Sequence, residues 1–155
     1  MIQTVAAVRP GAADVLLHPF FWSADKRLGF FGDVSDRVEK EKDDSPVVKR
    51  LERNAKLVTN GGWRNHICDL LAEGDILLNY YKIIYLDLRK HRTYKSHSVR
   101  DLLRAMRNKK HHYRELPEDV RNALGHIPDQ YLHYWTSRFP PVCHNMTRIG
   151  KIFSC

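Results

Sequence analysis

The segment from Ser98 to Arg114 places a helix-periodic apolar stripe beside a concentrated run of positive charge. Its apolar residues recur at the i, i+3, i+4 and i+7 spacing of one helix face: Val99, Leu102, Leu103 and Met106. Ser98 precedes the stripe and Asp101 stands three residues after Ser98, which resembles a capping box in a weaker form because Asp replaces Glu. The segment therefore predicts an amphipathic helix, whose other face should carry Arg100, Arg104, Arg107, Asn108 and His111.

The rest of the chain repeats this helical spacing and shows no clean two-residue alternation of the kind that marks a strand. Ser45-Pro46 supplies an N-cap residue followed by proline at the first helical position. Trp63, behind the turn Asn60-Gly61-Gly62, is expected to anchor the core. Because 155 residues are the length of one domain, we expect a compact all-α domain. Its further helices are predicted over residues 12–22, 28–42 and 47–54, from Leu116-Pro117 to Gly125, and from Pro128 to Pro140-Pro141.

Positive charge is concentrated in one part of the chain. Residues 89–114 contain ten Lys/Arg against one acid, Asp101, so this window carries +9, whereas the rest of the chain sums to −1. Four of the nine histidines also lie in the window. A localised basic face on a nearly neutral body is typical of proteins that bind polyanions. The alternative interpretation is a solvated basic surface without a ligand.

The basic window contains the side chains that metal-independent RNA cleavage requires. In that reaction the ribose 2′-OH attacks the adjacent phosphate, so a base must accept its proton and an acid must protonate the departing 5′ oxygen. Histidine suits proton transfer near neutral pH, and arginine binds two phosphate oxygens at once. The residues available for these roles are His111, His112, Arg107, Lys109, Asn108 and, upstream, Tyr94.

Spacing limits which of these side chains reach one phosphate. Arg107 and His112 are five residues apart, about 140° around a continuous helix, so they converge only if the helix ends near residues 108–110. Leu116-Pro117 disfavours the helical conformation at Leu116 and so favours a break in this part of the chain. Spacing alone does not decide between His111 and His112. A continuous helix would place on one face Arg104, Asn108 and His111.

Other kinds of site compete for these residues or lack their sequence signature. His112 and Glu115 form an i,i+3 pair that could reach a metal ion, but no second ligand pair stands nearby and the surrounding cations would repel it. We therefore expect neither a metal nor a cofactor. Three widely spaced cysteines without a CxxC pair oppose a disulfide framework and fit a reducing compartment. The apolar segments are too short to span a bilayer, so no membrane insertion is expected.

From Phe30 to Pro140 the chain resembles a known nuclease domain. That domain is the kinase-extension nuclease (KEN) domain of the inositol-requiring kinase/endoribonuclease of the unfolded protein response, shared with the 2-5A-dependent ribonuclease L. The run from Arg9 to Trp22 is similar to the final helix of a protein-kinase domain, but the sequence has no kinase glycine-rich loop, HRD or DFG motif, so we expect no kinase activity. The segments that match the nuclease domain are Asp33–Glu41, Pro46–Arg53, Trp63-Arg64, Asp87–Lys95 and Ser98–Pro117.

The resemblance implies an all-helical, metal-independent endoribonuclease that leaves a 2′,3′-cyclic phosphate and a 5′-hydroxyl. His112 matches the family's catalytic histidine, the general acid, and Tyr94 matches its general base. Arg107 and Asn108 match residues that grip the scissile phosphate. The residues expected to bind RNA beside them are Lys109, Lys110, Arg104 and His111. From the residues alone, Tyr94 is equally an aromatic at a helix entrance, and Asn108 a polar group at a helix end.

The resemblance also divides the chain. Residues 1–27 are expected to be the remnant of a kinase C-lobe terminal helix, residues 28–140 the nuclease domain, and residues 141–155 a divergent short tail typical of a truncated or alternatively spliced product. Residues of about 69–82 form an extra loop relative to the family. Either this loop is tolerated at the surface, because lengthening a loop costs little entropy, or it displaces Tyr94 and disables the site.

The sequence leaves two functions open. The first is an endoribonuclease that cleaves stem-loop RNA in messenger-RNA splicing and decay of the unfolded protein response, active as a dimer. The second is a catalytically impaired module that binds RNA, or pairs with a full-length kinase/ribonuclease and modulates it. The expected partners are stem-loop RNA and a second copy or the full-length enzyme. The expected location is the cytoplasm, which in the parent family means the cytosolic face of the endoplasmic reticulum.

Overall fold

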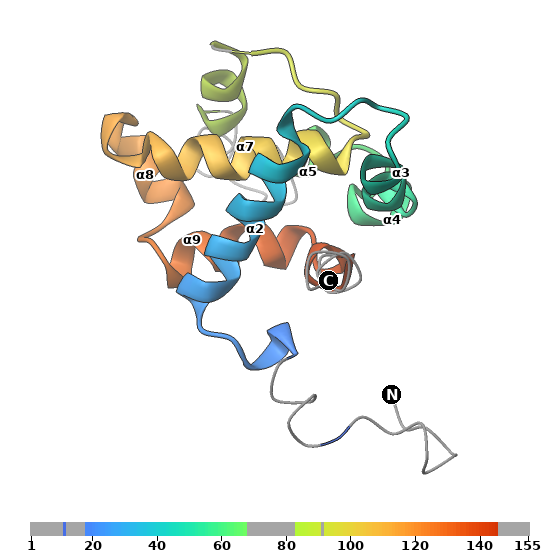
Figure 1. The fold of residues 1–155 in the computed structure, drawn as a ribbon. Coiled ribbons are helices and arrows are strands. Elements are labelled where there is room, and N and C mark those ends of the chain that lie inside the picture. Colours follow the sequence, from blue (N-terminus) through green and yellow to red (C-terminus); the bar gives the residue numbers. More distant parts are fainter. Residues whose placement is uncertain (1–10, 12–17, 68–82, 91, 146–155) are drawn as a thin grey trace.

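The structure, a computed structural model, describes residue 11 and residues 18–67, 83–90 and 92–145. Within these ranges the chain forms helices joined by turns and loops, and no residue belongs to a strand, which confirms the all-α prediction (Figure 1). Residues 83–90 and 141–145 are also helical. The remaining elements are η2 (Pro19–Phe21), α2 (Ala24–Glu39), α3 (Pro46–Glu52), α4 (Ala55–Val58), α5 (Trp63–Ile67), α7 (Val99–His111), η3 (Tyr113–Glu115), α8 (Glu118–Leu124) and α9 (Asp129–Arg138).

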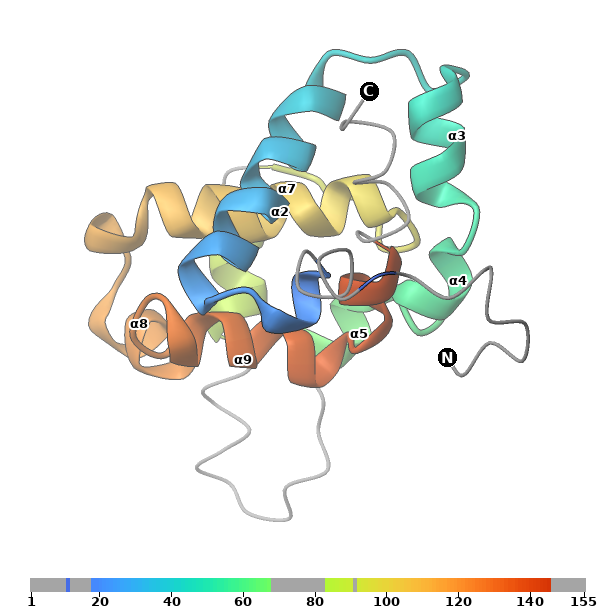
Figure 2. The same ribbon diagram turned by 60° about the horizontal axis from the view of Figure 1, so that its bottom comes forward.

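Helices α2 and α7 cross at the centre of the molecule and make its most extensive helix–helix contact (Figures 1 and 2). The predicted apolar stripe of α7 is buried at all four positions. Helix α2 starts at Ala24, four residues before the predicted start, because the Ser23 hydroxyl caps it by accepting from the Lys26 amide. Helices α3 and α4 lie at the N-terminal end of α7, and α8 and α9 cover its other end (Figure 1).

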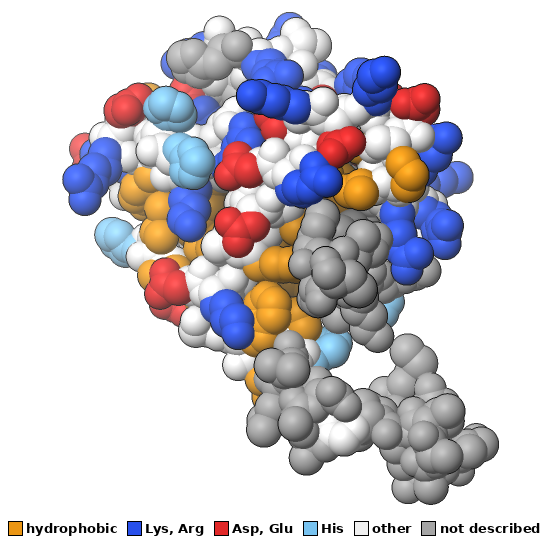
Figure 3. Space-filling model, in the orientation of Figure 1, with side chains coloured by type: hydrophobic (Ala, Val, Ile, Leu, Met, Phe, Trp, Pro, Cys, Tyr) orange, Lys and Arg blue, Asp and Glu red, His pale blue; other side chains and the backbone are white. Residues whose placement is uncertain are grey.

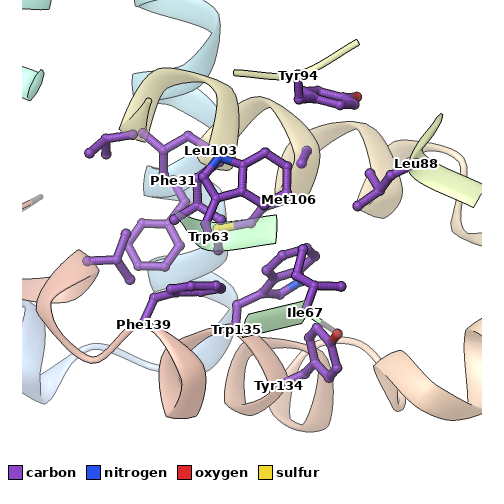
Figure 4. Packing of buried hydrophobic residues seen from close by; sticks show 14 of the residues in the cluster. Phe31, Trp63, Ile67, Leu88, Tyr94, Leu103, Met106, Tyr134, Trp135 and Phe139 are labelled. Atoms are coloured by element: carbon purple, nitrogen blue, oxygen red, sulfur yellow. The ribbon is translucent and has the colours of Figure 1, made fainter. Parts of the chain in front are cut away.

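The core is built around large aromatic side chains that α5 and α9 contribute. Trp63 and Trp135 are fully buried and lie close to Phe31, Phe139 and Met106 (Figure 4). The Trp63 indole Nε1 also donates to the Lys95 carbonyl at 3.1 Å, and its backbone N–H donates to the Ser96 carbonyl at 2.9 Å. The predicted core anchor therefore also fastens the loop of residues 92–98 to the core.

The N-terminus of α7 is capped differently from the prediction. Ser98 Oγ accepts from the Asp101 amide at 3.2 Å, which is the first half of a capping box. The Asp101 carboxylate does not return the bond, because it accepts from the Lys95 amide at 2.6 Å instead. Glu52, at the end of α3, accepts from Ser98 Oγ at 2.7 Å and from the amides of Val99 and Arg100 at 2.9 and 3.0 Å. A carboxylate distant in sequence thus satisfies the orphan donors of this helix.

The helices in the C-terminal part of the domain begin and end close to the predicted residues. Helix α8 stops at Gly125, whose φ of 75° lies in the left-handed region that favours glycine. Helix α9 then buries Tyr131, Leu132 and Trp135. The predicted helical residues 12–17 and the extra loop of about 69–82 lie outside the described residues. In the described part of the chain, no helix has the length and apolarity needed to cross a membrane.

Candidate functional site

Three of the four predicted catalytic residues form one hydrogen-bonded group. Asn108, near the end of α7, donates from Nδ2 to the Tyr94 hydroxyl at 3.2 Å. The Oδ1 atom of the same amide accepts from Arg107 Nη2 at 3.1 Å and from Arg107 Nε at 3.3 Å. One side-chain amide therefore connects a phenol on the 92–98 loop to a guanidinium on the helix.

Tyr94 is held in place by the packing of its loop. Its side chain is buried, and its ring meets the Trp63 ring edge-on with 5.9 Å between centroids. The next residue, Lys95, is tied twice: its carbonyl accepts from the Trp63 indole, and its amide donates to Asp101. The position of the Tyr94 hydroxyl is thus set by bonds to both α5 and α7.

Arg107 is engaged with two carboxylates of α2. Its Nη1 atom pairs with Asp36, and its Nη2 atom lies 3.4 Å from Glu39 Oε2. Glu39 also accepts from Arg104 Nε at 2.7 Å and lies 3.7 Å from Arg92. Burial of the Glu39 carboxyl raises its pKa, but the hydrogen bond and charge of Arg104, with the charges of Arg107 and Arg92, outweigh burial and leave the pKa below its ordinary value.

His112 lies where α7 ends. The helix continues to His111, one residue beyond the predicted break at residues 108–110, and His112 is its C-cap with φ −95° and ψ 20°. The His112 side chain is exposed, and its Nδ1 atom lies 2.9 Å from Oε2 of Glu115. In the view of Figure 3, histidine side chains lie at the left of the molecule, where α7 ends and α8 begins. The chain therefore turns at the histidine itself, and the bond to Glu115 orients the ring with Nε2 as its outward nitrogen.

Two of the residues predicted to bind RNA are buried in ion pairs. Lys109 is 6% exposed and pairs with the buried Asp87 carboxylate. Arg104 is 7% exposed and pairs with Asp101 at 2.6 Å and with Glu39. The expectation that Arg104 lies on an open basic face is wrong, because α2 packs across that side of α7 and supplies acidic side chains to it. Figure 3 shows the result: acidic and basic side chains alternate across this face instead of forming one basic surface.

The other two, Lys110 and His111, remain nearer to solvent. Lys110 is half-buried and His111 is exposed. Both line a small hollow of about 130 Å³ between α2 and the end of α7, to which Arg107 and Asp36 also contribute. Their predicted contact with RNA stays a prediction.

A second cavity, of about 250 Å³, lies beside Tyr94. Sequence reasoning did not single out its three arginines. Arg89 and Arg92 belong to the basic window, so their charge was a usable signal. Arg64 stands outside the window and reaches the cavity only through the fold. The cavity is lined by Trp63, Arg64, Tyr85, Leu88, Arg89, Arg92, Thr93 and Tyr94.

The predicted His112/Glu115 pair has no further ligand beside it in the described ranges, where no three His, Cys, Asp or Glu side chains are grouped so that they could hold a metal ion. The predicted His112/Glu115 pair is formed, but as a contact between two exposed side chains.

The sequence of this chain matches the family model described as ribonuclease 2-5A over residues 27–152. The chain belongs to the ribonuclease 2-5A family. This family match continues past residue 140, where the divergent tail was predicted to begin. It also covers every predicted site residue.

Three relatives are much longer than this chain, and two of the three are named for two activities. The serine/threonine-protein kinase/endoribonuclease ire-1 of Caenorhabditis elegans is 68% identical over 140 residues, which are 90% of this chain and 13% of the relative. The serine/threonine-protein kinase/endoribonuclease IRE2 of Homo sapiens is 50% identical over 140 residues, 90% of this chain and 14% of the relative. A sensor for unfolded proteins in the ER, ire1 of Schizosaccharomyces pombe, is 37% identical over 153 residues, 96% of this chain and 13% of the relative. The chain thus spans about one seventh of the length of the relatives it matches.

Proposed function

We propose that this chain is an endoribonuclease that cleaves stem-loop RNA without a metal ion and acts as a dimer in messenger-RNA processing of the unfolded protein response. The observation that carries the proposal is the Tyr94–Asn108–Arg107 group, in which a proton-accepting oxygen and a phosphate-binding guanidinium share one amide. The family membership and the names of the relatives support the same activity.

Each residue of the site has a chemical role in this proposal. The Tyr94 oxygen, as phenolate, accepts the proton of the ribose 2′-OH while that 2′ oxygen attacks the neighbouring phosphorus. Arg107 and Asn108 donate hydrogen bonds to the phosphate oxygens, on which negative charge grows in the transition state. His112 gives a proton from Nε2 to the departing 5′ oxygen. The bond between the 2′ oxygen and phosphorus forms as the bond between phosphorus and the 5′ oxygen breaks. One product therefore carries a 2′,3′-cyclic phosphate and the other a 5′-hydroxyl.

The test is cleavage of a stem-loop RNA by the purified chain in EDTA, beside the His112→Ala variant. We expect cleavage in EDTA, and a rate roughly 10²- to 10⁴-fold lower for His112→Ala. Product 5′ ends should accept phosphate from a polynucleotide kinase without prior dephosphorylation, because they carry hydroxyls. Loss of cleavage in EDTA would show the mechanism to be wrong.

Dimerisation is tested separately by its concentration dependence. If two copies form the active species, the specific cleavage rate rises with protein concentration and then levels off. Sedimentation of the chain over the same range should show the dimer appearing in parallel. A specific rate that is constant across the monomer range would remove the dimer from the proposal.

One observation favours a second function, a catalytically impaired module that binds RNA or pairs with the full-length enzyme. Arg107 is already engaged by Asp36 and Glu39, so a phosphate must displace at least one carboxylate to reach the guanidinium. The same assay separates the two functions. RNA binding without products, in a sample that sediments as a folded protein, would support the impaired module.

A further inference from the structure

The cavity beside Tyr94 combines a buried aromatic wall with an arginine rim. Trp63, Leu88 and Tyr94 are its buried lining residues, and all three are labelled among the core residues of Figure 4. Arg89 and Arg92 are exposed and Arg64 is half-buried, so the cationic groups lie toward the solvent side. A volume of about 250 Å³ lies below the range of about 300–1,000 Å³ typical of small-molecule pockets, so the cavity suits one nucleotide rather than several.

The charge of this rim is less neutralised than that of the predicted site cations. None of the eight lining residues is acidic. Within the described residues, neither Arg64 nor Arg89 forms an ion pair, and the Arg89 guanidinium lies 5.6 Å from the centroid of the Tyr85 ring. Among the described acids, Arg92 pairs with Glu39 alone, at 3.7 Å.

By contrast, three of the cations predicted on α7 are already paired. Arg104, Arg107 and Lys109 each contact at least one carboxylate of the same chain. An incoming phosphate would have to compete with those carboxylates, whereas no described carboxylate pairs with Arg64 or Arg89. Among the described residues, these two arginines therefore leave positive charge near Tyr94 without an ion pair.

We propose that this cavity is an RNA subsite that holds the nucleotide next to the cleaved bond, with its phosphate on Arg64 and Arg89 and its base against the half-buried ring of Tyr85. Tyr94 joins the two places, because it lines the cavity and also belongs to the hydrogen-bonded group with Asn108. Basic side chains that follow the backbone, beside aromatic faces that stack with bases, are how proteins hold single-stranded nucleic acid. The subsite rests on the proposed function, since it positions the strand for cleavage at Tyr94.

The test measures binding and cleavage separately. The binding probe is a fluorescein-labelled stem-loop RNA with 2′-fluoro riboses, which lacks the attacking hydroxyl and so stays intact. Its affinity is measured by fluorescence anisotropy across a salt series for Arg64→Gln, Arg89→Gln and the control Arg50→Gln. Arg50 is exposed on α3, away from the cavity lining, and its replacement removes the same charge.

We expect Arg64→Gln and Arg89→Gln each to weaken binding roughly three- to tenfold, the loss of a charge-assisted contact to phosphate. The plot of log affinity against log salt has a negative slope, and each substitution should make this slope less steep by about 0.7, the value for one phosphate contact to a single strand. Arg50→Gln should leave the slope unchanged. Arg64→Lys keeps a point charge and should recover most of the affinity, which a folding defect at position 64 would not allow.

Each result bears on a different statement. If Arg64→Gln and Arg89→Gln bind as Arg50→Gln does, while ordinary RNA is cleaved, the subsite is wrong and the proposed function stands. If both variants lose affinity but the unmodified chain does not cleave ordinary RNA, the subsite stands as an RNA-binding site and the proposed function is wrong. Failure of the unmodified chain to bind the probe would overturn both.

Discussion

At the scale of single residues, Asn108 has the most direct influence on the proposed site. Its amide Nδ2 donates to the Tyr94 hydroxyl and its Oδ1 accepts from the Arg107 guanidinium, so Asn108 sets the distance between these two side chains. Periodicity placed Asn108 on the polar side of its helix. Its partner 14 residues earlier, on a loop, follows only from the fold.

Replacing Asn108 with alanine should slow cleavage far more than it destabilises the chain. The variant removes a donor at the phosphate and releases Tyr94, for which we expect a roughly 10²- to 10³-fold lower single-turnover rate. The amide is half-buried, so the free energy of unfolding should fall by no more than about 1.5 kcal/mol. The control is Asn122→Ala, on the exposed side of α8. Cleavage by Asn108→Ala at the unmodified rate would contradict the assigned role.

Lys109 is the residue whose interpretation the structure changes most. Sequence and resemblance place it among the RNA-binding cations, yet its amine is buried against the buried carboxylate of Asp87. The pair joins the helical residues 83–90 to α7. A structural role and an RNA-binding role predict different effects of the same substitution.

Lys109→Met should lower the free energy of unfolding by roughly 3–5 kcal/mol, because it leaves the Asp87 carboxylate buried without a partner. The double variant with Asp87→Leu should regain much of that loss. Urea unfolding of the two single variants and the double variant, as a double-mutant cycle, measures the coupling. A Lys109→Met protein of full stability that no longer binds RNA would instead make Lys109 a ligand of the RNA.

At the scale of elements, α7 depends on α3 for its start. Glu52 accepts three hydrogen bonds from the first residues of α7, and its charge lies at the positive end of the helix dipole. This contact fixes the end of α7 that is opposite to the proposed site. The helix therefore has one anchored end and one functional end, with Asn108 and Arg107 in its last turns.

Glu52→Ala should destabilise the domain by about 1–3 kcal/mol, since it removes a cap and leaves backbone donors half-buried. Thermal unfolding measures the loss, and hydrogen exchange should show the Val99 and Arg100 amides exchanging faster. Glu118→Ala, an exposed acid in the first turn of α8, serves as the control. Unchanged exchange at both amides would mean that water replaces the carboxylate without cost.

At the scale of the whole molecule, acidic residues of α2 balance the basic window. Asp36 and Glu39 face Arg107, Arg104 and Arg92, so the charge of +9 counted along the sequence is partly neutralised in space. Figure 3 shows acidic and basic side chains side by side on this face. The charge network also links α2 to α7, which makes the stability of their packing sensitive to acid.

The free energy of unfolding should depend on the ionisation of Glu39. Its pKa is lowered in the folded chain, so its contribution is fully present above the ordinary value of 4.5 and is lost as the pH falls through the folded-state pKa. Glu39→Gln should cost roughly 1–3 kcal/mol at neutral pH, where a hydrogen bond between charged groups is lost. Urea unfolding at several pH values should show the two proteins converging in acid. A difference that persists at the lowest pH would mean that the loss is one of packing.

Much of the domain could be predicted from the sequence because it depends on neighbours along the chain. The α7 stripe, the Ser45-Pro46 start, the Gly125 stop and the buried Trp63 are all formed as expected. Spacing along a helix decides which residues share a face, and caps and glycine act within one turn. The candidate catalytic residues were likewise named from residue type, spacing and resemblance.

Tertiary structure decided what those residues touch. Whether Arg104 and Lys109 face solvent depends on acids 22 to 65 residues away, which no local pattern reports. The same holds for the Glu52 cap and for Arg64 meeting Arg89 at one cavity. The physical reason is that charge and hydrogen bonding act through space over a few ångströms. The sequence alone therefore determined the helices and the identity of the charged groups. Only the packing of α2, α3 and residues 83–90 and 92–98 around α7 decided which of the described charges are neutralised by ion pairs and which are not.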